Sequence, residues 1–160
     1  MDNQRTPRSY STGTVNLTNA ENKINGDIII MGSGNILTYT TLDALGGARV
    51  ALSYGNSLAL HNQTTLSLLS DDAEGIMLLS ESLDLDMTGY KGALGANGKQ
   101  TYTGKITLGE NDSYRFGGSG HLTLDTVLDE SQSMILDGQS NSGSSVTFAR
   151  ENAYTGGHII

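Results

Sequence analysis

Hydrophobic and polar residues alternate in short runs along most of this 160-residue chain. The clearest runs fill residues 102–128, where polar or glycine-rich turns separate three alternating stretches. Each such run is typical of a short β-strand that buries one face. The pattern therefore predicts an all-β protein. The apolar residues of the expected strands are Val15, Leu17, Ile28, Ile30, Ile36, Val50, Leu52, Tyr54, Leu58, Leu60, Leu66, Leu68, Ile76 to Leu79, Leu83, Leu85, Met87, Ile106, Leu108, Tyr114, Phe116, Leu122, Leu124, Met134, Leu136, Val146 and Phe148.

Two segments are harder to assign from the pattern. Within residues 71–87, the apolar spacing that starts at Ala73 also fits a helix. We favour strands there, because Gly75 lies inside the segment and its flanks alternate. Residues 89–98 contain four glycines and are expected to form a loop.

One order of aromatic, glycine and apolar residues recurs along the chain. Copies of this unit open at Tyr10, Tyr102 and Tyr154. The Gly-Ser-Gly of residues 32–34 matches residues 118–120 at an offset of 86. Chance likeness between Gly/Ser/Thr-rich strands is the alternative, but the order of residue types is kept as well as the composition. At this offset Ile36 aligns with Leu122, Thr40 with Thr126 and Leu42 with Leu128, and Ile28 and Ile30 stand in the places of Tyr114 and Phe116. In the openings of the two copies, which match at a different offset, Val15 and Leu17 stand in the places of Ile106 and Leu108.

Such recurrence is typical of repeat architectures, in which no single unit buries its own apolar face. The openings of the three copies, at residues 10, 102 and 154, are unequally spaced. A closed barrel does not tolerate such unequal spacing, whereas a solenoid with coils of about 20 residues does. We therefore predict a right-handed parallel β-helix that forms a single domain over residues 10–160.

Residues 1–9 are polar, contain the single proline and are expected to form a disordered leader. They lack the apolar segment of a secretory signal peptide. If the protein is secreted, this chain is accordingly expected to be a fragment of the exported protein.

A parallel β-helix makes specific demands on its side chains. Inward Ile, Leu and Val residues of successive coils are expected to stack in columns. Corner glycines supply a positive φ, and corner asparagines are expected to adopt the same geometry and to bond along the stack. The rings of Tyr102 and Tyr154 are expected to cap corners.

Charge and composition exclude several classes of partner. The chain has a formal net charge of −8, with nine Lys and Arg residues in total. Nucleic-acid binding needs a basic patch that neutralises phosphates, so no nucleic-acid partner is expected. No apolar run approaches the roughly 18–20 residues of a membrane-spanning helix, so this segment is not expected to insert into a membrane. The absence of cysteine excludes disulfides and thiolate sites.

Two parts of the chain resemble a known repeat. Asn152, Tyr154, Gly156, Gly157 and Ile160 fit an N-x-Y-x-G-G-x-x-I opening. The continuation, G-x-G-x-L-x-L, is matched by Gly118, Gly120, Leu122 and Leu124. These residues resemble the autotransporter-associated β-strand repeat over residues 102–128 and 152–160. In the middle copy, Gln100 and Lys105 replace the Asn and the second Gly of the motif.

The resemblance implies a segment of a large bacterial passenger protein, folded as a parallel β-helix. Such a passenger is secreted or displayed on the cell surface, where it serves as a stalk, adhesin or display scaffold. We therefore expect an extracellular or cell-surface location. Expected partners are a host glycan or surface protein, or further copies of the chain stacked end to end through an edge at Ile159 and Ile160.

The residues offer few candidates for chemistry. Asp84 and Asp86 point to the same side of an expected strand, and with Asp71 and Asp72 they form a conceivable Ca²⁺ site. We favour a solvated acidic strip. The three histidines are expected to be exposed and solvated: His61, His121 and His158.

A catalytic function is the alternative. Some parallel β-helices cleave polysaccharides with paired carboxylates, or with Ca²⁺ and a basic residue. Asp125 and Asp129 beside Arg115 are the best candidates for such a site. We favour a non-catalytic scaffold or adhesin without catalytic, cofactor-binding or metal-binding residues. The alternative is a carbohydrate-active β-helix, such as a fragment of a phage tailspike, polysaccharide lyase or hydrolase.

Overall fold

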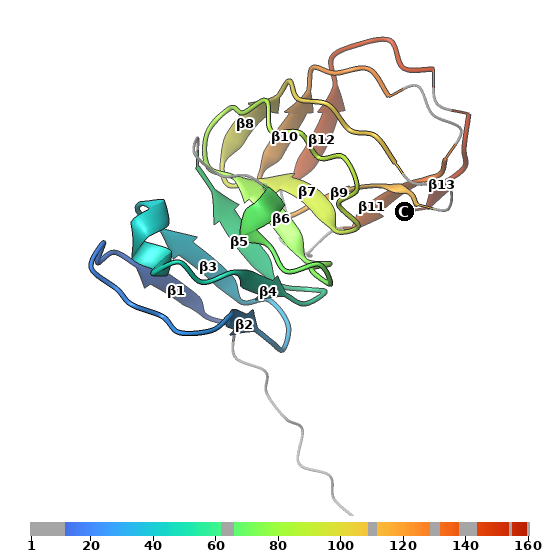
Figure 1. Ribbon diagram of the computed structural model, residues 1–160. Coiled ribbons are helices and arrows are strands. Elements are labelled where there is room, and N and C mark those ends of the chain that lie inside the picture. Colours follow the sequence, from blue (N-terminus) through green and yellow to red (C-terminus); the bar gives the residue numbers. More distant parts are fainter. Residues whose placement is uncertain are drawn as a thin grey trace, which may run out of the picture.

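A computed structural model describes residues 12–61, 66–108, 112–128, 132–137, 144–153 and 155–159. The expected leader, residues 1–9, and the tyrosines that open the first and third copies, Tyr10 and Tyr154, lie outside the described residues. The described chain is all-β, and its parallel strands stack as a solenoid (Figure 1). This confirms the predicted parallel β-solenoid.

The strands form three parallel sheets, which we name A, B and C. Sheet A contains eight strands in the order β1 (Thr14–Leu17), β3 (Ile36–Tyr39), β5 (Ser57–Leu60), β6 (Ile76–Leu79), β7 (Ala93–Ala96), β9 (Tyr114–Gly117), β11 (Met134–Asp137) and β13 (His158–Ile159). Sheet B contains β2 (Ile28–Ile30) and β4 (Val50–Leu52). Sheet C contains β8 (Lys99–Tyr102), β10 (His121–Leu124) and β12 (Ser145–Phe148).

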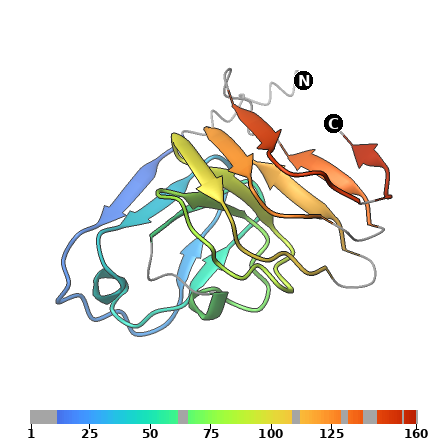
Figure 2. The same cartoon turned by 90° about the horizontal axis from the view of Figure 1, so that it is seen from above.

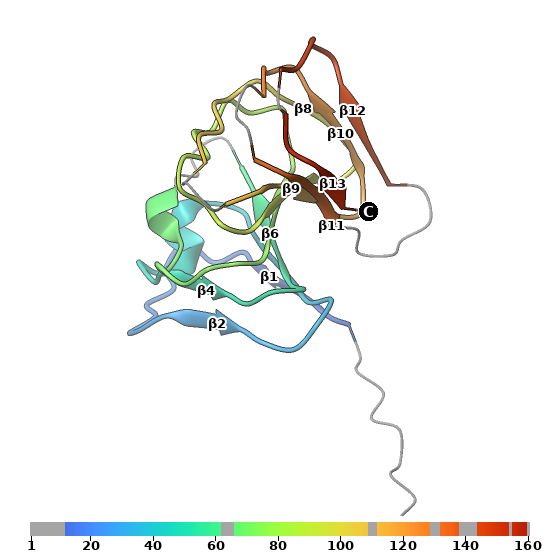
Figure 3. The same cartoon turned by 90° about the vertical axis from the view of Figure 1, so that its right-hand side faces the viewer.

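The coils at the two ends of the solenoid combine sheet A with different second sheets, sheet B at the N-terminal end and sheet C at the C-terminal end. In the N-terminal coils, β2 precedes β3 and β4 precedes β5, and a short 3-10 helix follows each of these two sheet A strands: η1 (Leu42–Leu45) after β3 and η2 (Leu66–Leu68) after β5. In the later coils, sheet C follows each strand of sheet A. Figures 2 and 3 show η1 and η2 side by side on one side of the molecule.

Strand register gives the length of each coil. In the first coil Thr14 lies opposite Ile36, whereas in a shorter coil near the middle of the chain Ile76 lies opposite Ala93. The longest step in sheet A joins Met134 to His158. These steps confirm the predicted coils of about 20 residues.

The hydrophobic core consists of columns that run along the solenoid. In one column, each residue lies opposite the next in neighbouring strands of sheet A, and all members are at most 3% exposed. Each fully buried side chain of this kind contributes roughly 1.5–3 kcal/mol. The predicted stacking of inward residues is thus confirmed. The column runs through Leu37, Leu58, Met77, Leu94 and Phe116.

The loop predicted at residues 89–98 is wrong, because β7 lies inside it and is buried throughout. The segment does not alternate, since both faces of the strand are covered. Gly95 is needed there: a Cβ on this residue would lie 2.0 Å from the carbonyl oxygen of Gly117 and 3.0 Å from Leu78 Cδ2. A glycine that reads as loop in the sequence instead lets two strands and a leucine approach closely.

Other expected strands are also absent or replaced. Leu66 and Leu68 lie in η2, not in a strand. Residues 83–87 and 105–108 form no named strand, although Leu83 makes an isolated parallel bridge to Tyr102. These segments hydrogen-bond coil to coil without a full ladder, as from Met87 N to Lys105 O at 2.9 Å. The helix considered for residues 71–87 is wrong, since β6 forms there.

The alignment at an offset of 86 does not follow the structural repeat. It places β3 on β10, which belongs to a different sheet, and β2 on β9, which also lies in a different sheet. The matching segments share a local pattern in which glycine precedes a short strand. The structural unit is instead the coil.

Corner geometry agrees with prediction for glycine and differs for asparagine. Gly32, Gly34 and Gly118 have φ of +93°, +75° and +104°. In the described parts of the chain, no residue other than glycine has a positive φ. The asparagines Asn35 and Asn56 bond along the stack as expected, at 3.1 Å from Asn35 N to Asn56 Oδ1, but with ordinary backbone angles.

Tyr102 caps a corner, as predicted. Its ring is fully buried in the core. Its hydroxyl shares its one proton between the carbonyl oxygens of Leu85 and Lys105, at 2.6 and 2.8 Å. The corner is therefore capped from within, and Gly104 is required beside it, because a Cβ there would lie 2.3 Å from Leu85 O.

Candidate functional site

The histidines occupy unrelated environments. His121 is exposed, as expected, with its Nδ1 2.9 Å from Ser145 Oγ. His61 is half-buried and contacts the ring of Tyr39 edge-on, with centroids 5.2 Å apart, so the expectation of a solvated side chain is wrong there. The side chain of His158 lies outside the described residues.

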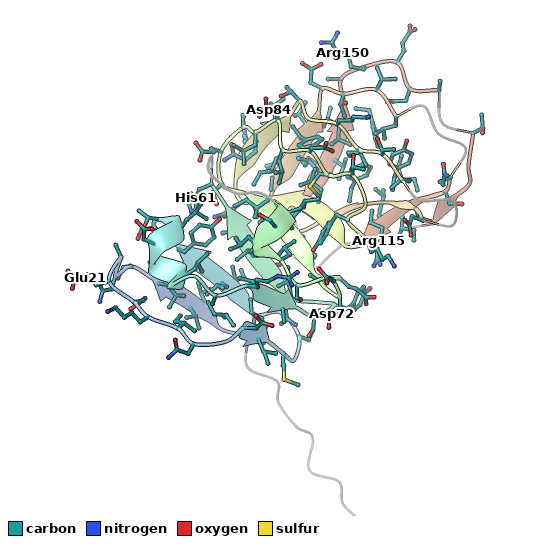
Figure 4. The ribbon with its side chains drawn as sticks, in the orientation of Figure 1. Glu21, His61, Asp72, Asp84, Arg115 and Arg150 are labelled. Carbon is teal, nitrogen blue, oxygen red and sulfur yellow. The ribbon has the colours of Figure 1, made fainter. Side chains whose placement is uncertain are left out.

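The four carboxylates considered for Ca²⁺ do not form one site. Asp71 pairs with Arg49 at 2.7 Å, and Figure 4 shows Asp72 and Asp84 at separate parts of the surface. Asp86 accepts hydrogen bonds from Thr88 Oγ1 and N at 2.6 and 2.9 Å. Within the described ranges, no three His, Asp or Glu side chains are close enough to hold a metal ion.

Hydroxyl groups lower the pKa of two of these carboxyl groups. The Ser70 hydroxyl, which donates to Asp72 Oδ1 at 2.6 Å, is the main cause of the lowered pKa of Asp72. The Thr88 hydroxyl has the same effect on the pKa of Asp86. Asp72 lies within the turn that Ala73 N and Ser70 O close at 3.1 Å, and Asp86 directly precedes the turn that Tyr90 N and Met87 O close at 3.2 Å. Binding hydroxyl or backbone groups of a local turn is an ordinary role for aspartate.

The residues considered for catalysis are also apart. Asp125 forms an ion pair with Arg150. Arg115 lies on β9, with its guanidinium 5.3 Å from the ring centroid of Tyr54, and Figure 4 shows Arg115 well away from Arg150. Asp129 lies outside the described residues. The described members of this group are therefore not brought together.

The structure instead reveals a groove that the sequence did not indicate. It has a volume of about 390 Å³ and lies between the coil that contains η2 and the following coil. We call it the junction groove. Its lining residues are Arg49, Leu66, Ser67, Leu69, Ser70, Asp71, Ala73, Thr88, Gly89, Tyr90 and Lys91.

A break in the coil-to-coil bonding creates the groove. Leu69 continues sheet B through a parallel bridge to Val50. In the next coil, Met87 and Gly89 donate their backbone N–H groups onward, to Lys105 and Thr107. Among the described residues, no backbone hydrogen bond joins residues 69–73 to residues 86–91. The two coils therefore separate on this side and leave a hollow.

Arg49 fixes one rim of the groove. Its Nε and Nη2 donate to the carbonyl oxygen of Leu69 at 3.0 and 2.6 Å, and Nη2 also donates to Asp71 Oδ1 at 2.7 Å. The bond to Asp71 is the main cause that raises the pKa of Arg49. The side chains of Arg49 and Asp71 are 45% and 97% exposed, so the ion pair itself contributes little stability.

The other rim is held by Tyr90. Its hydroxyl donates to Gly75 O at 2.9 Å, and burial raises the pKa of this phenol well above its usual value. The hydroxyl thus stays protonated and bonded. The next residue, Lys91, is exposed and forms no hydrogen bond or ion pair with any described residue. One rim thus carries Arg49, which is paired with Asp71, and the other rim carries Lys91, which has no pairing partner among the described residues.

A second hollow, of about 250 Å³, lies at the N-terminal end of the solenoid. Residues of β1, β2 and β3 line it, and its surroundings are apolar. Val15, Ile29 and Met31 are 58%, 64% and 72% exposed there. This face belongs to the open edges of sheets A and B, since β1 and β2 are edge strands.

The structure contains no helix, among its described residues, with the length and apolarity needed to cross a membrane. No protein-family model, curated protein or solved structure matches this chain.

Proposed function

We propose that this chain is a non-catalytic β-solenoid module of a bacterial cell-surface or secreted protein, where it acts as a scaffold or adhesin. The observation that carries the proposal is the parallel ladder of eight strands in sheet A, backed by continuous core columns. Such a ladder makes a stiff body whose two side walls present loops and grooves. Stiffness and side-wall display are what a stalk or adhesin needs.

The dispersal of the reactive side chains supports the non-catalytic part of the proposal. Asp125 is neutralised by Arg150, and Arg115 lies in another sheet over Tyr54. General acid and base pairs of glycosidases need carboxyl groups within about 5–10 Å of each other, around one scissile bond. Asp125 is the one carboxylate of this candidate group among the described residues, and it is paired with Arg150.

The carbohydrate-active β-helix remains the second candidate, and the junction groove is the observation that favours it. Incubation with a panel of acidic and neutral oligosaccharides tests both functions. We expect binding of at least one oligosaccharide without any change in its length. Release of new reducing ends or of unsaturated products would overturn the non-catalytic proposal.

End-to-end stacking of copies stays a prediction. The N-terminal end presents β1 and β2, of sheets A and B, whereas the C-terminal end presents β13 and β12, of sheets A and C. Two stacked copies would therefore continue only sheet A. Sedimentation velocity over increasing protein concentration tests this, and a monomer at every concentration would contradict stacking.

A further inference from the structure

We propose that the junction groove binds a carboxylated sugar, such as a hexuronate unit of an acidic polysaccharide, with Lys91 contacting the carboxylate. The inference rests on the proposed binding function and names its ligand class. The contact is made by Lys91, the cation of the groove lining that has no pairing partner among the described residues.

The size of the groove fits this class of ligand. Its volume of about 390 Å³ lies within the range of roughly 300–1,000 Å³ that small-molecule sites occupy. The groove is open along the side wall, between two coils, so a sugar unit within a longer chain can enter with both neighbours left in solvent. An enclosed cavity would admit only a free monosaccharide.

The lining has both surfaces that a pyranose ring needs. Leu66 is half-buried and gives an apolar surface for the C–H face of the ring, and the buried Leu69 and Ala73 also belong to the lining. The carboxylate of Asp71 on the rim is almost fully exposed and can accept hydrogen bonds from the hydroxyl groups of the sugar. A mixture of apolar floor and few polar rim groups is the usual composition of a small-molecule site.

Charge favours an acidic over a neutral sugar. Within the lining, Asp71 pairs with Arg49, and Lys91 is the cation without a pairing partner among the described residues, while Asp27 and Asp72 lie near Arg49 but outside the lining. The bonds of Arg49 to Leu69 and Asp71 use Nε and Nη2, so the Nη1 donors remain for a ligand oxygen. Ammonium–carboxylate hydrogen bonds are about twice as strong as those between neutral groups.

The acidity of the whole chain sets the conditions of binding. A net charge of −8 repels an anion at long range. At physiological salt, charges are screened beyond about 8 Å, so the local contact with Lys91 decides the interaction. Added salt weakens this exposed contact further, and the affinity for the acidic sugar is therefore expected to fall as NaCl rises.

The test compares a trimer of galacturonic acid with the matching neutral trimer of galactose, by calorimetric titration of the full chain. We expect the acidic trimer to bind and the neutral one to bind at least about tenfold more weakly. Lys91→Gln should weaken binding of the acidic trimer by about tenfold, and Lys91→Arg should restore most of it. Lys99→Gln, an exposed lysine on β8 outside the groove, is the matched control and should bind like the parent.

Three results would overturn the inference: no binding of the acidic trimer at millimolar concentration, equal binding of both trimers, or unchanged binding by Lys91→Gln. Melting curves confirm that each variant is folded. Cleavage of the trimer by the parent protein would instead overturn the non-catalytic function and leave the ligand class standing. The two failures are thus distinguishable.

Discussion

The corner that precedes sheet A is built in two ways along the solenoid. Asn35 and Asn56 stand directly before β3 and β5, whereas Gly75 and Gly92 stand directly before β6 and β7. The register shows that the coils with the asparagine corner, from β1 to β3 and from β3 to β5, are the longer ones. The next two coils, from β5 to β6 and from β6 to β7, are shorter.

In the wider corner, side-chain amides fill the space between coils. Asn56 is fully buried, and its Oδ1 accepts from Asn35 N and Nδ2 at 3.1 and 3.2 Å. Its Nδ2 donates to the carbonyl oxygens of Gly32 and Ser53 at 3.2 and 3.3 Å. The amide therefore satisfies backbone groups that the turn leaves without partners.

In the tighter corner, the backbone itself fills the space. A Cβ on Gly75 would lie 2.4 Å from Leu52 Cγ, and one on Gly92 would lie 2.2 Å from Gly75 O. The Tyr90 hydroxyl bonds the same Gly75 oxygen. In these four coils, asparagine thus stands at the corners of the longer pair and glycine at the corners of the shorter pair, and the shorter coils are the ones beside the junction groove.

The largest loss of stability is expected when an asparagine replaces the glycine of a glycine corner. Gly75→Asn should destabilise the protein by about 3 kcal/mol, because its Cβ overlaps Leu52 and the carbonyl of Asn56. Urea unfolding measures this. Gly13→Ala is the control, since its Cβ would meet nothing closer than 3.6 Å and should change stability by less than about 0.5 kcal/mol. A Gly75→Asn variant as stable as this control would refute the distinction between corners.

The converse change removes the amide from the wide corner. Asn56→Ala should cost about 2–3 kcal/mol, because several buried backbone groups lose their partner. Equilibrium unfolding of Asn56→Ala and of Asn16→Ala, an exposed asparagine on β1, gives the comparison. Equal stability of the two variants would show that the buried amide does not hold the corner.

A smaller effect is expected from Tyr90→Phe, which removes one hydrogen bond to Gly75 and should cost about 1 kcal/mol at neutral pH. The pKa of Tyr90 is raised from its usual 10.0 by burial. A raised folded-state pKa gives stability that is present below pH 10 and is lost as the pH rises further. The parent should therefore lose more stability than Tyr90→Phe between pH 10 and 11, as followed by denaturant titration. Parallel losses in both proteins would contradict the burial of this phenol.

The smallest effect concerns the turn beside the groove. Thr88→Val removes the hydroxyl that lowers the pKa of Asp86, so this pKa should rise toward its usual 3.8, while stability at pH 7 changes little because the group is exposed. The stability from a lowered pKa is present above pH 3.8 and is lost as the pH falls through the folded-state pKa. Carboxyl titration by NMR measures the shift. Asp72, whose pKa depends on Ser70, is the internal control, and an unshifted Asp86 would contradict the assignment.

The sequence predicts the fold well wherever one face of a strand is buried. Alternation placed Leu122 and Leu124 inward, and both are buried in the structure. It failed at β7, since a strand covered on both faces has no period of two and Gly95 reads as a loop residue. The sequence repeat also did not give the correct register of the coils. A glycine followed by a short strand is a local pattern, and it recurs in different sheets.

The junction groove could not be predicted from the sequence. Its rims come from separate coils, with Arg49 and Lys91 on opposite sides of a break in the ladder. Nothing in the local sequence marks where coil-to-coil bonding stops. A role can be assigned to a single lysine such as Lys91 only when its neighbours in the structure are known.

The most direct test of the coil register uses engineered disulfides, since the chain contains no cysteine. Thr101 lies opposite Thr123, and Thr123 opposite Thr147, in sheet C. Neighbouring strands are about 4.8 Å apart, which a disulfide spans, whereas the next strand but one, about 10 Å away, is out of reach. Thr101→Cys with Thr123→Cys should therefore crosslink on mild oxidation, and Thr101→Cys with Thr147→Cys should stay reduced. A crosslink in the second pair, and none in the first, would contradict the parallel solenoid.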